Sequence, residues 1–509
     1  MVKKFFSFIN SRIFTLATFF TIQLLIFLGL SYEFQKSFLW LYFLSHFINI
    51  ALAVFIINTR SNPAYKITWL LLIFVFPGFG AMIYIFFGEN WPLKKIRVQM
   101  CEVVLYFKKS FRNHEKMKHK IQDKDAYFQS YYIEKYAHFP VFDDSDAKYL
   151  KEGLDFYNCL ISELKEAKKF IFLEFFIIEE GLMWNSILDI LEEKVKEGVD
   201  VRLIYDDIGC ISKLPRRYYR KLREKGIKVH VFNPVKLFMM PSHNNRDHRK
   251  IAVIDGKAGF TGGINLADEY INHIEKFGYW KDTGVLIKGK AVWGLTVMFL
   301  SMWNYYSEED ESIFKFFPEV DDKFNNTIGY VQPFGDSPLD GETVGETAYL
   351  NIISKAKDYV YITTPYLILS NEVLSALCNS AKGGVDVRII TPHIPDKKLI
   401  HMVTRSYYEV LIESGVKIHE FTPGFIHSKS FVSDDKFAIV GSINMDFRSL
   451  YLHFESAIWF YNMDLIKDIK LDFINTQNKS QEISLKEVQD VLLAKKILQS
   501  VLRVFAPVM

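Results

Sequence analysis

Two short motifs of the same form carry the side chains best suited to chemistry. In each, a histidine is followed two residues later by a lysine and seven residues later by an aspartate. An imidazole titrates near about pH 6.5, so two of them can divide the work of nucleophile and general acid/base. Two lysines in one pocket would stabilise the developing charge of a phosphoryl group. The candidate catalytic residues are His248, Lys250 and Asp255 in the first motif and His427, Lys429 and Asp434 in the second.

The residues downstream of each motif repeat with it. A glycine lies 14 residues and an asparagine 17 residues beyond each histidine, and a carboxylate follows further on. The asparagines and the two lysines are candidates to hold a phosphate, and the carboxylates are candidates to fix the histidine tautomers. No ordered set of metal ligands accompanies them, so a metal-independent phosphodiester reaction is the simplest chemistry. These residues are Gly262 and Gly441, Asn265 and Asn444, and the carboxylates Asp282 and Glu455.

Strand geometry predicts which of these side chains face a common cleft. Residues i and i+2 of a strand point to one face, so the histidine and lysine of each motif face the same way. The run Ile251–Ile254 is typical of a strand, and Asp255-Gly256 of the turn that ends it. Because the motif aspartates lie on the opposite strand parity, we expect Asp255 and Asp434 to hold their own loops.

The elements that position the motifs occur twice, in the same order. Short β-branched and aromatic runs alternate with helical stretches, which predicts an α/β fold. Three segments of the first half return in the second at offsets of 189, 186 and 189 residues, which favours duplication over chance. We therefore expect two homologous halves, 140–330 and 331–485, that share one cleft. The paired segments are 167–173 with 356–362, 199–204 with 385–390, and 226–230 with 415–419.

Composition narrows the class of protein. The chain has 509 residues, of which 50% are hydrophobic, and a formal net charge of +3, which argues against a nucleic-acid partner. Four widely separated cysteines exclude a disulfide scaffold. Three uncharged runs of membrane-spanning length, 13–32, 37–59 and 67–88, predict a transmembrane anchor over 1–92. A linker at 93–139 and an amphipathic tail at 486–509 complete the predicted organisation.

The duplicated motifs resemble those of the phospholipase D superfamily, and their surroundings are similar to bacterial cardiolipin synthases. The similarity is carried by Arg246–Lys250 and Gly262–Asn265 in the first half and by Pro423–Lys429 and Asn444–Ser449 in the second. The chain departs from the family at His453, where asparagine is common, and in the additional run 13–32.

The resemblance implies a reaction in which two phosphatidylglycerol molecules become cardiolipin and glycerol through a phosphatidyl-histidine. It implies His248 as nucleophile and His427 as acid/base, although both motifs are complete and the residues themselves do not distinguish the roles. It further implies no cofactor, a lipid bilayer as partner, and a multi-pass protein of the bacterial cell membrane.

Other functions are compatible with parts of this pattern. A phospholipase D-type hydrolase would use the same residues with water as the acceptor. A nuclease of the same superfamily is disfavoured by the predicted spans and the near-neutral charge. A non-catalytic scaffold would have no reason to keep two His/Lys/Asn sets in register. The oligomeric state stays open, with a homo-oligomer among the alternatives.

Overall fold

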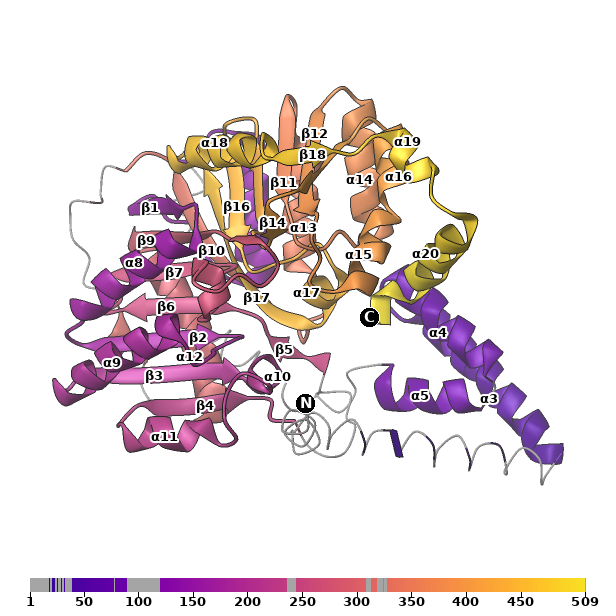
Figure 1. Cartoon of the computed structure of the whole chain (residues 1–509), viewed down its shortest axis with the longest axis horizontal. Coiled ribbons are helices and arrows are strands. Elements are labelled where there is room, and N and C mark those ends of the chain that lie inside the picture. The colour runs from indigo at the N-terminus through magenta and orange to yellow at the C-terminus, as the bar shows by residue number, and fades with distance from the viewer. Residues whose placement is uncertain are drawn as a thin grey trace.

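Two sheets with the same strand order form the body of the protein (Figure 1). The computed structural model describes residues 18, 21, 22, 25, 29, 32, 39–76, 78–88, 120–235, 244–307, 313–317, 324 and 327–508. Within these ranges the first half forms a seven-stranded sheet in the order β1-β9-β7-β6-β2-β3-β4. Its strands are β1 (Ser145–Leu150), β2 (Phe170–Phe175), β3 (Asp200–Asp206), β4 (Lys228–Phe232), β6 (Lys250–Ile254), β7 (Ala258–Gly262) and β9 (Gly284–Gly289).

The second half repeats this order and extends it at one edge. Its described strands run β10-β17-β16-β15-β11-β12-β13, and β18 is added beyond β13. The three repeated sequence segments form β2 and β11, β3 and β12, and β4 and β13, which confirms the predicted duplication and the α/β class. The strands are β10 (Tyr330–Asp336), β11 (Tyr359–Thr363), β12 (Asp386–Pro392), β13 (Lys417–Phe421), β15 (Ser430–Ser433), β16 (Phe437–Gly441), β17 (His453–Tyr461) and β18 (Ser480–Glu482).

Helices cover the faces of both sheets (Figure 1), so the inner strands are buried on both sides. All six residues of β2 are buried, for example. The helices of the first half are α8 (Gly153–Lys165), α9 (Leu182–Lys196), α10 (Asp207–Cys210), α11 (Tyr218–Glu224) and α12 (Val292–Tyr306). Those of the second are α13 (Val344–Lys355), α14 (Asn371–Lys382), α15 (Lys398–Arg405), α16 (Tyr408–Glu413), α17 (Phe447–Tyr451), α18 (Leu465–Gln477), α19 (Leu485–Gln489) and α20 (Leu493–Phe505).

The two halves share one hydrophobic core. Phe172 and Ile251 of the first sheet belong to the same buried cluster as Val440 and Ile458 of the second. Helix α12 lies between them, and its Phe299 stacks on Phe172 with ring centroids 4.6 Å apart. Burying one such aromatic side chain stabilises the fold by about 1.5–3 kcal/mol. The relative position of the two motifs is therefore held by core packing.

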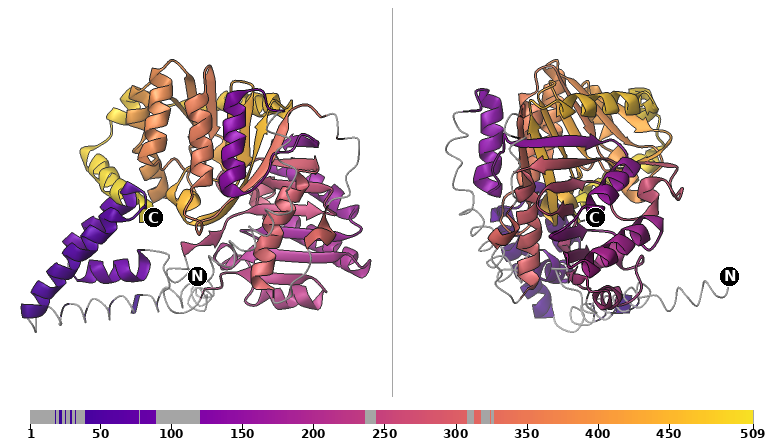
Figure 2. Two further views of the ribbon diagram at one scale, coloured as in Figure 1. Left: turned by 180° about the vertical axis from the view of Figure 1, so that it is seen from behind. Right: turned by 90° about the vertical axis from the view of Figure 1, so that its left-hand side faces the viewer.

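The described part of the predicted linker belongs to the body of the protein. Helix α7 (Lys124–Tyr132) packs beside α13 on the back of the second sheet (Figure 2). The Trp459 indole donates to Gln129 Oε1 at 3.0 Å, and the Gln332 amide donates to the carbonyls of Ser130 and Phe139. Residues 120–139 therefore precede the first half in sequence but cover the second half in space.

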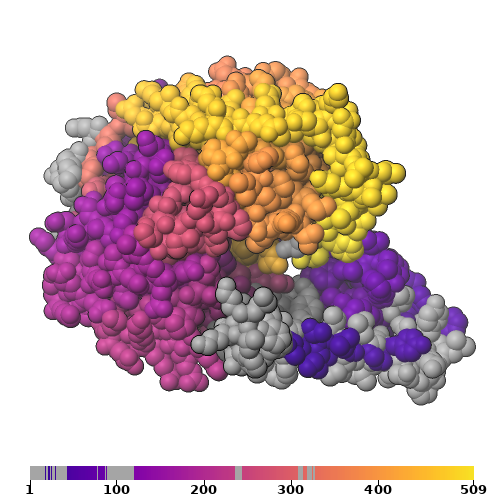
Figure 3. Space-filling model, viewed as in Figure 1, coloured from indigo at the N-terminus to yellow at the C-terminus, as the bar shows by residue number. Residues whose placement is uncertain are grey.

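The N-terminal helices project from one side of the body (Figure 3). On that side α20 contacts α4. The expected run 37–59 contains α3 (Leu39–Asn58), while most of run 13–32 lies outside the described residues. The third run, 67–88, is not one helix: α4 (Pro63–Val75) and α5 (Phe79–Phe87) are separated at Gly78, whose φ of 80° suits glycine. Over the described residues, no helix is both long and apolar enough to cross a membrane.

Candidate active site

Two short strand pairs exchanged between the halves position the motif histidines. Strand β5 (Arg246–Asp247), from the first half, pairs parallel with the start of β17 in the second. Reciprocally, β14 (Gly424–Ile426) of the second half pairs parallel with β8 (Tyr279–Lys281) of the first. The strand pairing continues into each motif, because His248 N donates to Phe454 O at 2.9 Å and His427 N donates to Lys281 O at 2.7 Å.

This exchange places each histidine against the carboxylate of the other half. His248 Nδ1 lies 2.9 and 3.0 Å from the two carboxylate oxygens of Glu455, and His427 Nδ1 lies 2.6 Å from Asp282 Oδ2. Both carboxylates are fully buried. A carboxylate that accepts from Nδ1–H leaves the Nε2 lone pair for a substrate. The geometry suits one nucleophile and one acid/base, and each histidine depends on both halves.

Burial favours the neutral form of both imidazoles before the lipid binds. It lowers the pKa of His248 to about 3, against the opposing effect of Glu455, and together with Lys429 and Lys250 it lowers the pKa of His427 well below its usual value. A neutral imidazole has the free lone pair that nucleophilic attack requires.

The two carboxylates differ from each other. Burial alone would raise the pKa of Glu455, but the electrostatic interaction and the hydrogen bond with His248 outweigh it, so this pKa lies well below its ordinary range. Burial raises the pKa of Asp282 to about 6, although the Lys429 charge opposes that shift. Glu455, beside His248, is thus ionised at neutral pH, whereas Asp282, beside His427, titrates closer to neutral pH.

The motif lysines are buried beside the histidines, and each folds back onto its own motif. Lys250 Nζ donates to His248 O at 2.5 Å, and Lys429 Nζ donates to His427 O. Burial lowers the pKa of Lys250 to about 7 and that of Lys429 to about 8. An anionic phosphate in the cleft would favour their charged forms.

The two asparagines have different surroundings. Asn265 Oδ1 accepts from the backbone N–H of Ile177 at 3.0 Å, and its Nδ2 donates to the Tyr270 hydroxyl at 2.7 Å. Asn444 is also buried, and its Oδ1 has no hydrogen-bond partner among the described residues. Both polar atoms of Asn265 are thus engaged, whereas the Asn444 oxygen has no partner within the described ranges.

The motif aspartates lie away from the histidines. Asp255 follows the last residue of β6, five residues beyond Lys250, a separation of about 16 Å along an extended strand. Its carboxylate accepts the backbone N–H groups of residues 168, 169 and 170, and Asp434 accepts those of residues 357, 358 and 359 in the same way. Both aspartates have a φ of 54°. Each carboxylate thus links the turn after one strand to the backbone at the start of the neighbouring strand.

Three residues outside the predicted set contribute to the site. Ser442 Oγ donates to Glu455 Oε2 at 2.5 Å, and its counterpart in the repeat is Gly263, where an added Cβ would come within 2.1 Å of Asp282. The repeat register was the signal that could have singled out this pair. His453, which the sequence marks as a departure from the family, has two buried ring nitrogens with no hydrogen-bond partner in the part of the chain that the structure describes. Its ring lies 5.6 Å from the His248 ring, centroid to centroid.

One group of these side chains could hold a cation. Among the described residues, ligand atoms of His248, His453 and Glu455 all lie within 4.8 Å of one another. Imidazole nitrogens with a carboxylate form a donor set that suits zinc. Because His248 belongs to this group, an ion held there would compete with its reaction at phosphorus.

A duplicated α/β fold with two histidine–carboxylate pairs and two buried lysines close enough to shift one another's pKa values defines a phosphoryl-transfer enzyme. The family model "Cardiolipin synthase, PLD-like domain" matches residues 160–297 and 349–476, and "Phospholipase D-nuclease N-terminal" matches 47–89. The chain belongs to the cardiolipin synthase family, a group of phosphatidyltransferases within the phospholipase D superfamily.

Individual relatives cover nearly the whole chain. The chain is 32% identical to the cardiolipin synthase of Alkalihalophilus pseudofirmus over 90% of this chain and 92% of that protein. It is 42% identical to an uncharacterized protein of Streptococcus mutans, over 90% of this chain and 100% of that one. The crystal structure of a phosphatidylserine synthase from Haemophilus influenzae aligns with a TM-score of 0.54 at 15% identity, over 75% of this chain and 97% of that one. The last similarity concerns the fold.

Proposed function

We propose that this enzyme transfers a phosphatidyl group from one phosphatidylglycerol to another and releases glycerol. The observation that carries the proposal is the crossed pair of histidine–carboxylate contacts, which supplies one nucleophile and one acid/base. Lys250, Lys429 and Asn444 hold the phosphate, whereas Asn265 acts through Tyr270 and the backbone of Ile177.

In the first step, His248 Nε2 attacks the phosphorus of the donor lipid. A P–N bond forms, the P–O bond to the headgroup glycerol breaks, and His427, which carries a second proton once the anionic phosphate is bound, gives that proton to the departing oxygen. In the second step, His427 takes the proton from the primary hydroxyl of the second lipid, whose oxygen attacks the same phosphorus. The P–N bond then breaks, His248 is restored, and cardiolipin leaves. No external oxidant or metal enters the balance.

The first 92 residues attach the enzyme to the bilayer, and in this proposal the chain crosses it more than once. Uncharged runs of about 20 residues support this. The C-terminal helix α20 adds an apolar surface, since Leu492 and Leu493 are 80% and 73% exposed and Ile497 and Val501 lie on the same helix. Such a surface beside basic side chains suits the headgroup boundary.

The test is product analysis in phosphatidylglycerol vesicles with a chelator present, comparing the wild type with His248→Ala. We expect cardiolipin and an equal amount of glycerol from the wild type and neither from the variant. Phosphatidic acid without cardiolipin would identify water as the acceptor and replace this proposal with hydrolysis. Equal cardiolipin from both proteins would exclude the assigned nucleophile.

A further inference from the structure

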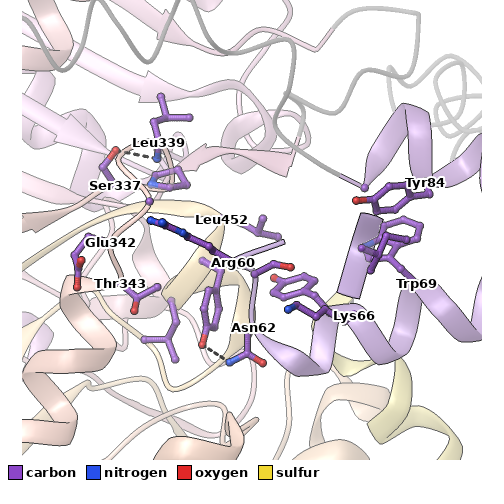
Figure 4. A pocket seen from close by; sticks show the side chains of 18 of the residues that line it. Arg60, Asn62, Lys66, Trp69, Tyr84, Ser337, Leu339, Glu342, Thr343 and Leu452 are labelled. Carbon is purple, nitrogen blue, oxygen red and sulfur yellow. Dashed lines mark hydrogen bonds between the residues drawn. The ribbon is translucent and has the colours of Figure 1, made fainter. Parts of the chain in front are cut away.

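A cavity of about 660 Å³ lies where the N-terminal helices meet the second half (Figure 4). One wall comes from the end of α3, the turn after it, α4 and α5, and another from the loop 337–343 and the end of α17. Phe55, Ile56, Trp69 and Tyr84 make one side apolar. A cavity of this size and mixed lining suits an amphipathic ligand.

Two cations and one carboxylate set the charge of this cavity. Arg60 lies on the turn between α3 and α4, and its side chain extends towards the loop that carries Ser337 (Figure 4). No ion pair joins Arg60 to another described residue, whereas Lys66 Nζ donates to Ile57 O at 2.8 Å. On the opposite wall, Glu342 Oε1 accepts a hydrogen bond from the Tyr132 hydroxyl at 2.6 Å. A phosphodiester could therefore accept from the Arg60 guanidinium.

The cavity lies beside the start of β17, the strand that carries Glu455. Leu452 lines it, and its carbonyl accepts from Asn245 Nδ2 at 3.1 Å, next to β5. The next residue, His453, begins β17, and Glu455 follows two positions later. A molecule bound in the cavity thus contacts the segment that leads directly to the carboxylate of His248.

We propose that this cavity binds an anionic glycerophospholipid outside the catalytic cleft, with the phosphate at Arg60 and acyl carbons along the apolar wall. The identity of the occupant rests on the proposed function, because an enzyme that joins two phosphatidylglycerols needs a second lipid close to the first. The position beside the apolar N-terminal helices agrees with a ligand drawn from the bilayer.

Native mass spectrometry of the full chain in detergent tests this proposal. The protein carries His248→Ala so that no lipid is consumed, and phosphatidylglycerol is titrated with and without Arg60→Gln. The matched control is Arg216→Gln, which removes one exposed arginine of the first half that does not line the cavity. We expect Arg60→Gln to weaken one lipid-binding event about tenfold or more and Arg216→Gln to leave it unchanged, since a charge-assisted hydrogen bond is lost in the first variant alone.

Three further arms separate the possible ligands. Phosphatidylcholine should not fill the site; equal binding of that lipid would overturn the anionic requirement. Inorganic phosphate should not displace the lipid; full displacement at the same affinity would indicate a free-phosphate site. An Arg60→Gln variant that binds phosphatidylglycerol like its control would overturn the proposal, even if the wild type makes cardiolipin. Conversely, Arg60-dependent binding without any cardiolipin product would refute the proposed function alone.

Discussion

Replacing Glu455 with glutamine tests the link between the two halves most directly. The carboxylate is fully buried, lies 2.9 Å from His248 Nδ1 and accepts from Ser442 Oγ at 2.5 Å. Glutamine keeps the shape of the side chain and removes the charge. Its amide can also donate to Nδ1, which would move the imidazole proton to Nε2 and remove the lone pair that attacks phosphorus.

The contacts determine the expected size of the effect. A hydrogen bond to a charged acceptor contributes about 1.5–3 kcal/mol, which at about 1.4 kcal/mol per decade corresponds to a loss of roughly 10- to 150-fold. A reversed tautomer costs more, about 10⁴-fold where an equivalent change has been made in serine proteases. We expect kcat of Glu455→Gln to fall between about 10²- and 10⁴-fold, with little change in the lipid concentration for half-maximal rate.

Stability is the necessary control. The folded-state pKa of Glu455 is depressed, so its ionisation stabilises the fold above the unfolded pKa of about 4.3, and this contribution is lost as pH falls through the folded pKa. Glu455→Gln should therefore melt at a lower temperature than the wild type at pH 7, whereas an exposed replacement, Glu413→Gln, should not. If folded Glu455→Gln kept more than about a fifth of the wild-type kcat, the assigned positioning role would be refuted.

Four further results are expected. In His427→Ala, a phosphatidyl adduct should accumulate on His248, as mass spectrometry of peptides would show; an adduct on His427 in His248→Ala would instead reverse the roles. Phosphate binding should weaken above about pH 7, where Lys250 loses its proton, and Lys250→Arg should shift that limb of the pH–kcat/KM profile upwards; an unchanged limb would assign it to another group. Asp434→Asn should lower the free energy of unfolding by about 1–3 kcal/mol in urea titrations and leave kcat near the wild-type value, since its carboxylate contacts backbone N–H groups; a selective loss of kcat would place it in catalysis. Micromolar Zn²⁺ should inhibit the wild type and should inhibit His453→Asn less; equal inhibition would exclude the His453 cluster.

Features encoded by local pattern could be predicted from the sequence. The segments 199–204 and 385–390 combine β-branched residues with a fixed offset, and they form β3 and β12 at equivalent places in the two sheets. The turn at Asp255-Gly256 follows from residue type, and both residues have positive φ. Both carboxylates that contact the histidines were also candidates from the sequence, because an acidic residue follows each repeated motif.

The pairing of those carboxylates could not be predicted in this way. Repeat register associates His248 with Asp282 and His427 with Glu455, whereas the structure pairs His248 with Glu455, 207 residues away. The exchange depends on β5 and β14, each of only two or three residues, whose short sequences carry no strand periodicity. By contrast, Pro77, Gly78 and Gly80 in the run 67–88 predict a kink or a re-entrant segment, and the structure separates two helices at Gly78.

The structure also breaks the symmetry that the duplication implies. Ser442 donates to Glu455, whereas the equivalent Gly263 has no side chain to donate to Asp282. The carboxylates also differ in pKa: the interaction with His248 lowers the pKa of Glu455, whereas burial raises the pKa of Asp282 to about 6. A phosphorylated imidazole carries positive charge at the stage when its carboxylate must stay ionised, which favours His248 as the nucleophile. The acid/base must instead gain and lose a proton within each cycle. A partner carboxylate whose pKa lies near neutrality, as that of Asp282 does, adds the smallest free-energy cost to these proton transfers. Unequal partners thus favour a division of labour between two motifs that are equivalent in sequence.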